Sequence, residues 1–393
     1  MHKRQLIVHP LLVLVGVWSL VMYLYSLHWS DLMSVKLIDG VPILLAAFAP
    51  FVYISALFAM RPPRAVRENG YQIEPGNEHG LTRALRIMAL MWASATLLEI
   101  IYSRGVPLEW LAIHSAKTYF DFGIPTLHGF LNALICTITT TCFLLYLRLR
   151  DRRFLAASMF VVVWGVIAMT RQLMMVCIFQ YAVIYACVRK LSLRKLLVYC
   201  CAALIVLAGF GALGDARTGA KKFESLAMPS ENYPEALPSV FLWGYMYAVT
   251  PLMNLIYTRD TRDSGHDLLM LHTIAPLLPS VLRNKLIVKE KNQKGNVISQ
   301  AFNVSTAFVD SYTDAGLLGV MLFAFGIAIP CVFYWYRYAN DDYALLIFSV
   351  LMQCLILTVF YDHFLSLPVI TQTAWVSVLR RVANRRLSLA HNS

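Results

Sequence analysis

The sequence predicts an all-α protein, a polytopic bundle of about ten membrane-spanning helices joined by one large loop. Hydrophobic residues make up 59% of the 393 residues and charged residues only 14%, whereas soluble domains carry about 25% charged residues. The mean hydropathy is +0.60, and apolar runs long enough to cross a bilayer recur along the chain. This composition excludes soluble globular, disordered, collagen-like and disulfide-scaffold proteins.

The apolar runs give ten expected spans, at 6–27, 41–60, 87–103, 129–147, 154–170, 173–188, 196–214, 316–336, 343–361 and 364–379. The first run follows basic residues, as in a signal peptide, but it is long and lacks a small-residue cleavage site, so we expect an uncleaved span. The spans divide the chain into an N-terminal bundle of about seven spans at 1–214, a large loop at 215–315, and a C-terminal bundle of about three spans with a basic tail at 316–393.

A twelve-span alternative adds 238–257 and 272–288, which both lie in the large loop. The second segment contains two prolines and two basic residues, which make it a poor span. We therefore expect 238–257 to form a helix in the membrane interface, with Trp243 and its neighbouring tyrosines at headgroup depth.

The net charge is +12, and twenty of the 34 lysines and arginines fall at alternate ends of the expected spans. The short loops at the opposite ends hold only Lys36, Arg104, Lys117 and Arg171. The positive-inside rule then predicts that both termini are cytoplasmic and that the excess charge does not indicate nucleic-acid binding. All eight cysteines lie inside expected spans, so we interpret them as packing residues.

Four arginines are candidate anion-binding residues. Arg171 lies in a tight turn between two spans, and Arg217 lies between two glycines at the start of the large loop. Arg259 and Arg262 are three residues apart in a polar cluster at 258–266, which suits phosphate oxygens. Each feature is also compatible with a simpler role, as an interfacial anchor, a helix terminus or a solvated loop.

The stretch 303–319 enters the eighth expected span and is the most distinctive part of the sequence. Its carboxylates Asp310 and Asp314 are four residues apart, hence on one helical face. Asp362 and His363 end the ninth span and are expected near the same place, where a polar cap is the simpler interpretation. The sequence has no phosphate-binding Gly-rich loop with lysine, no HExxH and no Gly-x-Ser-x-Gly motif, so chemistry driven by ATP or by a protein-bound metal is not predicted.

This combination of topology, large loop and local sequence resembles the O-antigen polymerases, the Wzy-type polymerases of oligosaccharide repeat units. The local match comprises Thr306, Tyr312, Asp314, Gly316 and Gly319. Some family members carry an arginine with a glycine eleven residues later, and none of the outer-loop arginines here has that spacing.

The resemblance implies a fold like that of GT-C-type glycosyltransferases and a reaction on the periplasmic side of a bacterial inner membrane. A growing glycan on undecaprenyl pyrophosphate would be transferred to a new repeat unit that is linked to another molecule of undecaprenyl pyrophosphate. The reaction would need no metal or other cofactor. It also implies contact with bilayer lipids and, as protein partners, a chain-length regulator and a flippase. An O-antigen ligase is the nearest alternative function, and a lipid-linked oligosaccharide flippase or transporter is an alternative from another class.

Within that reaction, residues take expected roles. Arg171, Arg217 and Arg259 or Arg262 would stabilise the leaving pyrophosphate, whose negative charge develops in a cleft of low dielectric constant. His266 or Asp314 would accept the proton of the attacking hydroxyl, and Tyr312 would orient a sugar.

Overall fold

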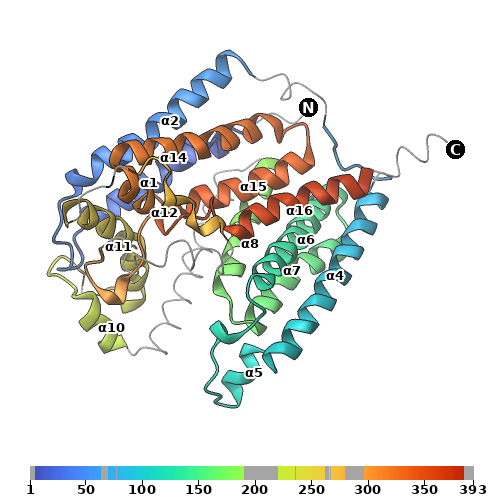
Figure 1. The fold of residues 1–393 in the computed structure, drawn as a ribbon, viewed down its shortest axis with the longest axis horizontal. Helices are drawn as coiled ribbons and strands as arrows, with labels where there is room; N and C mark the ends of the chain where they lie inside the picture. The colour runs from blue at the N-terminus through green and yellow to red at the C-terminus, as the bar shows by residue number, and fades with distance from the viewer. Residues whose placement is uncertain are drawn as a thin grey trace.

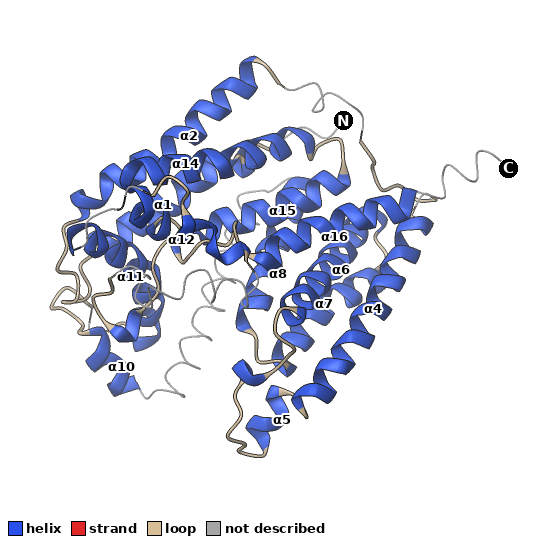
Figure 2. Ribbon diagram, viewed as in Figure 1, coloured by secondary structure: helices blue, strands red, loops and turns tan. Residues whose placement is uncertain are grey.

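The computed structural model describes residues 5–62, 70–76, 78–189, 220–234, 236–261, 265, 267–278 and 296–384. Within these segments all regular structure is helical, apart from an isolated β-bridge between Ser30 and Pro229 (Figure 2). Seven helical stretches of this described part are long and apolar enough to cross a membrane: Leu37–Met60, His79–Ala112, Leu127–Leu149, Arg171–Val188, Ser239–Thr261, Val309–Arg337 and Asp342–Val359. The predicted all-helical class is confirmed for the described residues, and the seven apolar helices are compatible with a membrane bundle.

The α-helices are α1 (Pro10–Ser26), α2 (Val41–Met60), α4 (His79–Ser103), α5 (Pro107–Ala112), α6 (Leu127–Leu149), α7 (Arg152–Ile167), α8 (Arg171–Val188), α10 (Ala220–Ala227), α11 (Ser239–Thr261), α12 (Leu271–Ile274), α14 (Val309–Arg337), α15 (Asp342–Ile356) and α16 (Leu367–Asn384). Short 3-10 helices are η1 (Leu6–Val8), η2 (Leu37–Gly40), η3 (Tyr119–Asp121), η4 (Ala275–Leu277), η5 (Gln300–Phe302) and η6 (Leu357–Val359).

The helices form two groups around a shared centre (Figure 1). On one side α14 packs along α2, with α1 and α11 against each other beside them; on the other side α4, α6 and α7 pack together. Between the groups lie α8, α15 and α16. Nearly every residue of α15 is buried, because its sequence is apolar on all faces and it is surrounded by other helices.

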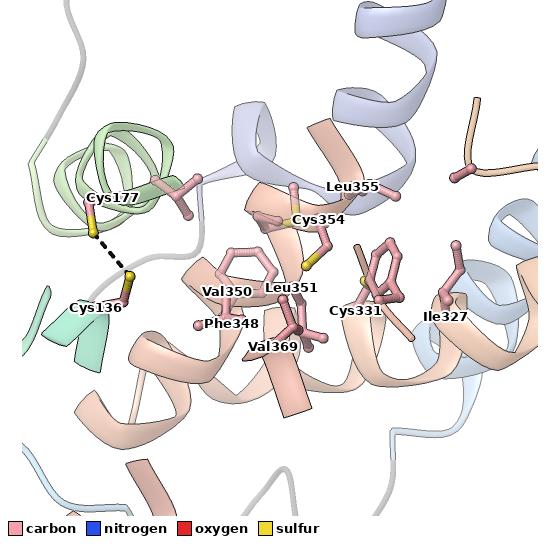
Figure 3. Close-up of a cluster of buried hydrophobic side chains, with 14 of the residues drawn as sticks. Cys136, Cys177, Ile327, Cys331, Phe348, Val350, Leu351, Cys354, Leu355 and Val369 are labelled. Atoms are coloured by element: carbon pink, nitrogen blue, oxygen red, sulfur yellow. Dashed lines mark hydrogen bonds between the residues drawn. The ribbon is translucent and has the colours of Figure 1, made fainter. Parts of the chain in front are cut away.

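The described cysteines are packing residues, as predicted. All six are free and buried. Cys331 of α14 and Cys354 of α15 lie among Ile327, Leu351 and Leu355, as Figure 3 shows. The thiols of Cys136 and Cys177 are 3.5 Å apart between α6 and α8, whereas Cys200 and Cys201 lie outside the described residues.

Three buried glutamines join the central helices inside this apolar interior. Gln180 of α8 and Gln372 of α16 exchange two side-chain hydrogen bonds of 3.1 and 2.9 Å. Gln180 also donates to Gln353 of α15 at 3.5 Å. An amide both donates and accepts, so this set satisfies most of its own polar atoms away from water.

Several expected helix bounds differ from the structure. The expected span 154–170 corresponds to α7, which has only 16 residues, and 196–214 lies outside the described residues. The helix expected at 238–257 is the continuous 23-residue helix α11, which has the length and composition of a span. Both of its ends contact the segment between α1 and α2, through Tyr245 with Trp29 and through Arg259 with Asp39. Its residues from Leu242 to Thr258 are mostly buried, because α1 covers one side and the loop before α14 covers another. The described start of 272–288 is the four-residue helix α12 followed by η4, and not a span.

Helix α14 contains the break on which the candidate site depends. Its backbone is non-helical at Ala315 and Gly316, where Gly316 has a φ of 59° and a ψ of −142°. That conformation is open to glycine and disfavoured for other residues. The expected span at 316–336 therefore begins at the break, and 309–314 form a short helical turn before it.

Candidate active site at the loop end of the bundle

The bundle has two chemically different ends. We call one the arginine end, because Arg148, Arg189, Arg337 and Arg380 lie there together with Gln5, which precedes η1. Gln5 contacts the Arg189 carbonyl at 2.9 Å and the Tyr338 hydroxyl at 2.8 Å. We call the opposite end the loop end; it is formed by 27–40, 104–126, 168–170, 228–238, 265–278, 296–308 and 357–366. The short loops at these two ends are the two sets that the charge pattern of the sequence separated; the segments 228–238, 265–278 and 296–308 belong to the large loop, which that pattern did not include.

Asp314 holds α12 against α14 at the loop end. Its carboxylate is 1% exposed, and Oδ2 accepts hydrogen bonds from the Thr273 backbone at 2.9 Å and the Thr273 hydroxyl at 2.7 Å. Oδ1 interacts with His272 Nδ1 and with the His272 backbone N–H at 3.3 Å. Donors thus occupy all four acceptor positions of the carboxylate, which leaves Asp314 as a positioning group in this structure.

The break in α14 explains why Asp314 reaches α12. The Thr313 and Asp314 carbonyls, freed from the helix, accept hydrogen bonds from Gly265 N at 2.8 Å and Asp267 N at 2.9 Å. Gly319 permits the turn before the break to pack on the helix after it, because a Cβ there would clash with the Ser311 carbonyl oxygen. Each glycine of the sequence motif therefore has a local backbone function.

Arg259 connects α11 with two other segments. Its guanidinium hydrogen-bonds to the Asp39 carbonyl and lies 3.6 Å from the Asp39 carboxylate, just before α2. It also interacts with the Tyr312 hydroxyl. The two predicted residues Arg259 and Tyr312 are thus brought together, and part of the donor capacity of Arg259 is used within the protein.

Arg171 is the first residue of α8 and is exposed. Helix α7 ends at Ile167, so the tight turn expected from the sequence is present. The first turn of α8 has no acidic residue and no side-chain cap from Thr170. Next to it, Gln172 donates a hydrogen bond to the Tyr361 hydroxyl, which links the start of α8 to the loop after α15.

Asp362 and His363 lie in that same loop, between η6 and α16. Both are buried, with 9% and 4% of their surface exposed. Asp362 Oδ1 accepts hydrogen bonds from Phe364 N at 2.7 Å and Leu365 N at 3.2 Å, which is the polar cap expected from the sequence. Burial raises the pKa of Asp362 to about 7, with a further contribution from Asp310 on α14, and burial lowers the pKa of His363 to about 4.

The predicted residues Arg217, Arg262 and His266 lie outside the described residues. Of the predicted site, the structure places Arg171, Arg259, Tyr312 and Asp314 at one end of the bundle. Within the described segments no three His, Cys, Asp or Glu side chains are arranged to hold a metal ion. No family model, curated protein or solved structure matches the chain.

Sequence reasoning missed His272, Thr273, Gln172 and Tyr361. His272 and Asp314 are 42 residues apart, and Gln172 and Tyr361 are 189 apart. Local spacing holds no information about such pairs. One signal was available, because Gly265 shortly before α12 lies at a close backbone approach to Asp314 and Gly316 in the motif lies at the break of α14.

Proposed function

We propose that this protein is a glycosyltransferase that polymerises lipid-linked oligosaccharide repeat units. In this proposal a growing glycan moves from undecaprenyl pyrophosphate to a repeat unit on the same carrier. The bundle has about ten spans and a GT-C-like fold, with both termini in the cytoplasm and the loop end in the periplasm of a bacterial inner membrane. The single observation that carries the proposal is the convergence of polar and ionisable side chains from α8, α12, α14 and the loop after α15 at one end of an apolar bundle.

The depth of these side chains suits a lipid-linked substrate. A polyprenyl tail remains in hydrocarbon, while its diphosphate and sugars require a polar environment at the membrane surface. Functional groups gathered at helix ends meet a headgroup at that depth. Ionisable groups at mid-depth would instead favour a transporter, and the polar contacts between α8, α15 and α16 inside the described bundle are made by uncharged glutamines.

The start of α8 supports binding of the leaving diphosphate. Unpaired backbone N–H groups and the helix dipole favour an anion at a helix N-terminus, and Arg171 adds a full positive charge there. A cation at this position is unfavourable for the isolated helix, so its presence suggests an anionic ligand. Arg217 is the second arginine of this proposed diphosphate site, and Arg259 supports Tyr312 from α11.

The motif that resembles the polymerases supports the proposal because its residues determine the backbone geometry at the start of α14. Thr306 accepts a hydrogen bond from Phe308 N at 3.2 Å and starts the turn before α14. Gly316 lies in the break, Gly319 permits the close packing of the turn before it, and Asp314 contacts His272 from that turn. In the proposed reaction Tyr312 orients a sugar, Asp314 positions α12, and His266 is one of the candidate proton acceptors.

The test uses purified protein reconstituted with an undecaprenyl-pyrophosphate-linked repeat unit. We expect wild-type protein to produce a ladder of glycans, and Arg171→Ala and Arg217→Ala to abolish the long products while insertion and protein level stay normal. Arg104→Ala is the matched control, because Arg104 is also an exposed arginine at the loop end. A wild-type ladder from both variants would refute the diphosphate assignment.

Product analysis in cells separates the alternatives. Loss of a polymerase leaves lipopolysaccharide capped with a single repeat unit, whereas loss of a ligase leaves the core bare. A transporter would move the lipid-linked substrate across liposomes without lengthening the glycan.

A further inference from the structure

Asp362 differs from the other buried carboxylates at the loop end, because only one of its oxygens has a partner. Oδ1 accepts the two backbone hydrogen bonds that shape the turn before α16. Oδ2 is buried and, within the described residues, has no hydrogen-bond partner. By contrast, donors reach both oxygens of Asp314 and both oxygens of Glu99.

An unpartnered buried carboxylate oxygen is costly and therefore requires an explanation. Folding alone does not need it, since an asparagine would cap the same turn through its single oxygen. A group that is free to bind a proton or a substrate hydroxyl provides such an explanation. Asp362 also lies close enough to the start of α14 for its charge to interact with that of Asp310.

The groups around Asp362 favour proton exchange near neutral pH. Among the described residues, the titratable groups that interact with its charge are Asp310 from α14, Cys354 from α15 and the neighbouring Tyr361, and His363 follows it in the chain. Burial and Asp310 raise the pKa of Asp362 to about 7, and His363, whose pKa is lowered to about 4, is neutral at that pH. A general base works best when its pKa is close to the working pH.

A surface suitable for a sugar adjoins this carboxylate. Tyr361 is 40% exposed, its ring lies 3.9 Å from the ring of His363, and its hydroxyl accepts a hydrogen bond from Gln172. An aromatic side chain held in this way offers an apolar face next to polar groups. It also joins Asp362 to the helix that begins at Arg171, the residue proposed for diphosphate binding.

We infer that Asp362 is a catalytic residue that accepts the proton of the attacking sugar hydroxyl through Oδ2. This inference rests on the proposed function. The hydroxyl oxygen forms a bond to the anomeric carbon of the donor, and the bond between that carbon and the diphosphate oxygen breaks. The diphosphate leaves with the bonding electron pair, and the hydroxyl proton moves to Oδ2, from which water later removes it.

The experiment measures the elongation rate of the reconstituted protein with the lipid-linked repeat unit between pH 5 and 9. Asp362→Asn keeps the turn but cannot accept a proton, and we expect it to lower the rate by about 10²–10⁴-fold. Asp31→Asn, at an exposed aspartate of the same end, is the matched control and should retain the wild-type rate. The wild-type rate should rise with pH with a midpoint near 7, because only unprotonated Asp362 accepts a proton.

A second variant tests the assignment without removing Asp362. Asp310→Asn removes the neighbouring negative charge, so the midpoint of the pH profile should move to lower pH. A purely structural role for Asp362 would leave that midpoint unchanged.

The outcomes separate this inference from the function on which it rests. If wild-type protein lengthens glycans and Asp362→Asn does so at the same rate, the assignment of Asp362 is wrong and the proposed function stands. An unmoved midpoint in Asp310→Asn would also overturn the assignment. If wild-type protein lengthens no glycan although substrate and protein are intact, the proposed function fails and the inference fails with it.

Discussion

Buried carboxylates occur at both ends of the bundle, but their partners differ. At the arginine end, Asp342 lies 2.5 Å from Arg148 and accepts a hydrogen bond from Ile73 N at 2.8 Å. Asp341 lies 3.2 Å from Arg380 and 3.5 Å from Arg337. At the loop end, Glu99 and Asp314 contact the imidazoles of His128 and His272, and Asp362 has no such partner within the described residues.

This difference separates scaffold from proposed chemistry. An arginine beside a carboxylate holds it through directed, charge-assisted hydrogen bonds, so the pairs at the arginine end fix the positions of helices. At the loop end, Asp362 Oδ2 has no hydrogen-bond partner within the described residues, so this is the end suited to the proposed acid–base chemistry.

The largest expected effect lies at the arginine end. Arg148→Ala leaves the Asp342 carboxylate, whose side chain is 2% exposed, without its cation. Removing one partner of a buried ion pair costs about 3–5 kcal/mol, and we expect this loss in unfolding of the detergent-solubilised protein. Arg153→Ala is the control, because that side chain is 94% exposed. Equal stability of the two variants would contradict the scaffold role.

The second prediction is a gain in stability at the loop end, in contrast to the loss expected for Arg148→Ala. The pKa of Asp362 is raised from 3.8 to about 7, so the folded protein is stabilised by holding this proton at low pH and loses that stability as the pH rises through 7. Asp362→Asn avoids the loss and should unfold less readily than wild-type protein at pH 8, by at most roughly 4 kcal/mol. Unfolding curves at pH 5 and pH 8 measure this, and a variant that is less stable at pH 8 would contradict it.

The smallest expected effect concerns the break in α14. Gly319→Ala introduces a clash with the Ser311 carbonyl, which we expect to cost about 1–3 kcal/mol and to displace Asp314 from α12. Gly326→Ala on the same helix is the control, since a Cβ there meets nothing within 4 Å. Thermal unfolding and the glycan ladder are the measurements. Identical behaviour of the two variants would show that the close approach at Gly319 is unimportant.

Composition and apolar runs were sufficient to predict the helical membrane class and the tight turn at Arg171, because both depend on local sequence. The rise in hydropathy predicts a span from 316, whereas the apolar helix of the structure is Val309–Arg337. What hydropathy does not reveal is that α14 begins at Val309 and breaks at Gly316. The preceding turn is polar, and it is held by backbone contacts with 265–267.

The candidate site was less predictable than the fold. The spacing of Asp310 and Asp314 suggested one shared face, but Asp314 is taken up by His272 and Thr273 on α12. Whether a carboxylate only caps a turn or can also accept a proton depends on distant residues as well. The charge of Asp310 on α14, for example, contributes to the raised pKa of Asp362 in the loop before α16. Only the folded arrangement determines which carboxylate retains an open oxygen.

The glutamines shared by α8, α15 and α16 have a mechanical consequence. If α8 or α16 turned about its own axis, the reciprocal hydrogen bonds between Gln180 and Gln372 would break and leave buried amide atoms without a partner, at a cost of several kcal/mol. These two helices are therefore held in one rotational orientation toward each other, and so are Arg171 and the turn before Leu367, which lie at their loop ends. In the proposed reaction, entry and departure of a bulky glycan would then rely on movement of the surrounding segments and leave this central pair undisturbed.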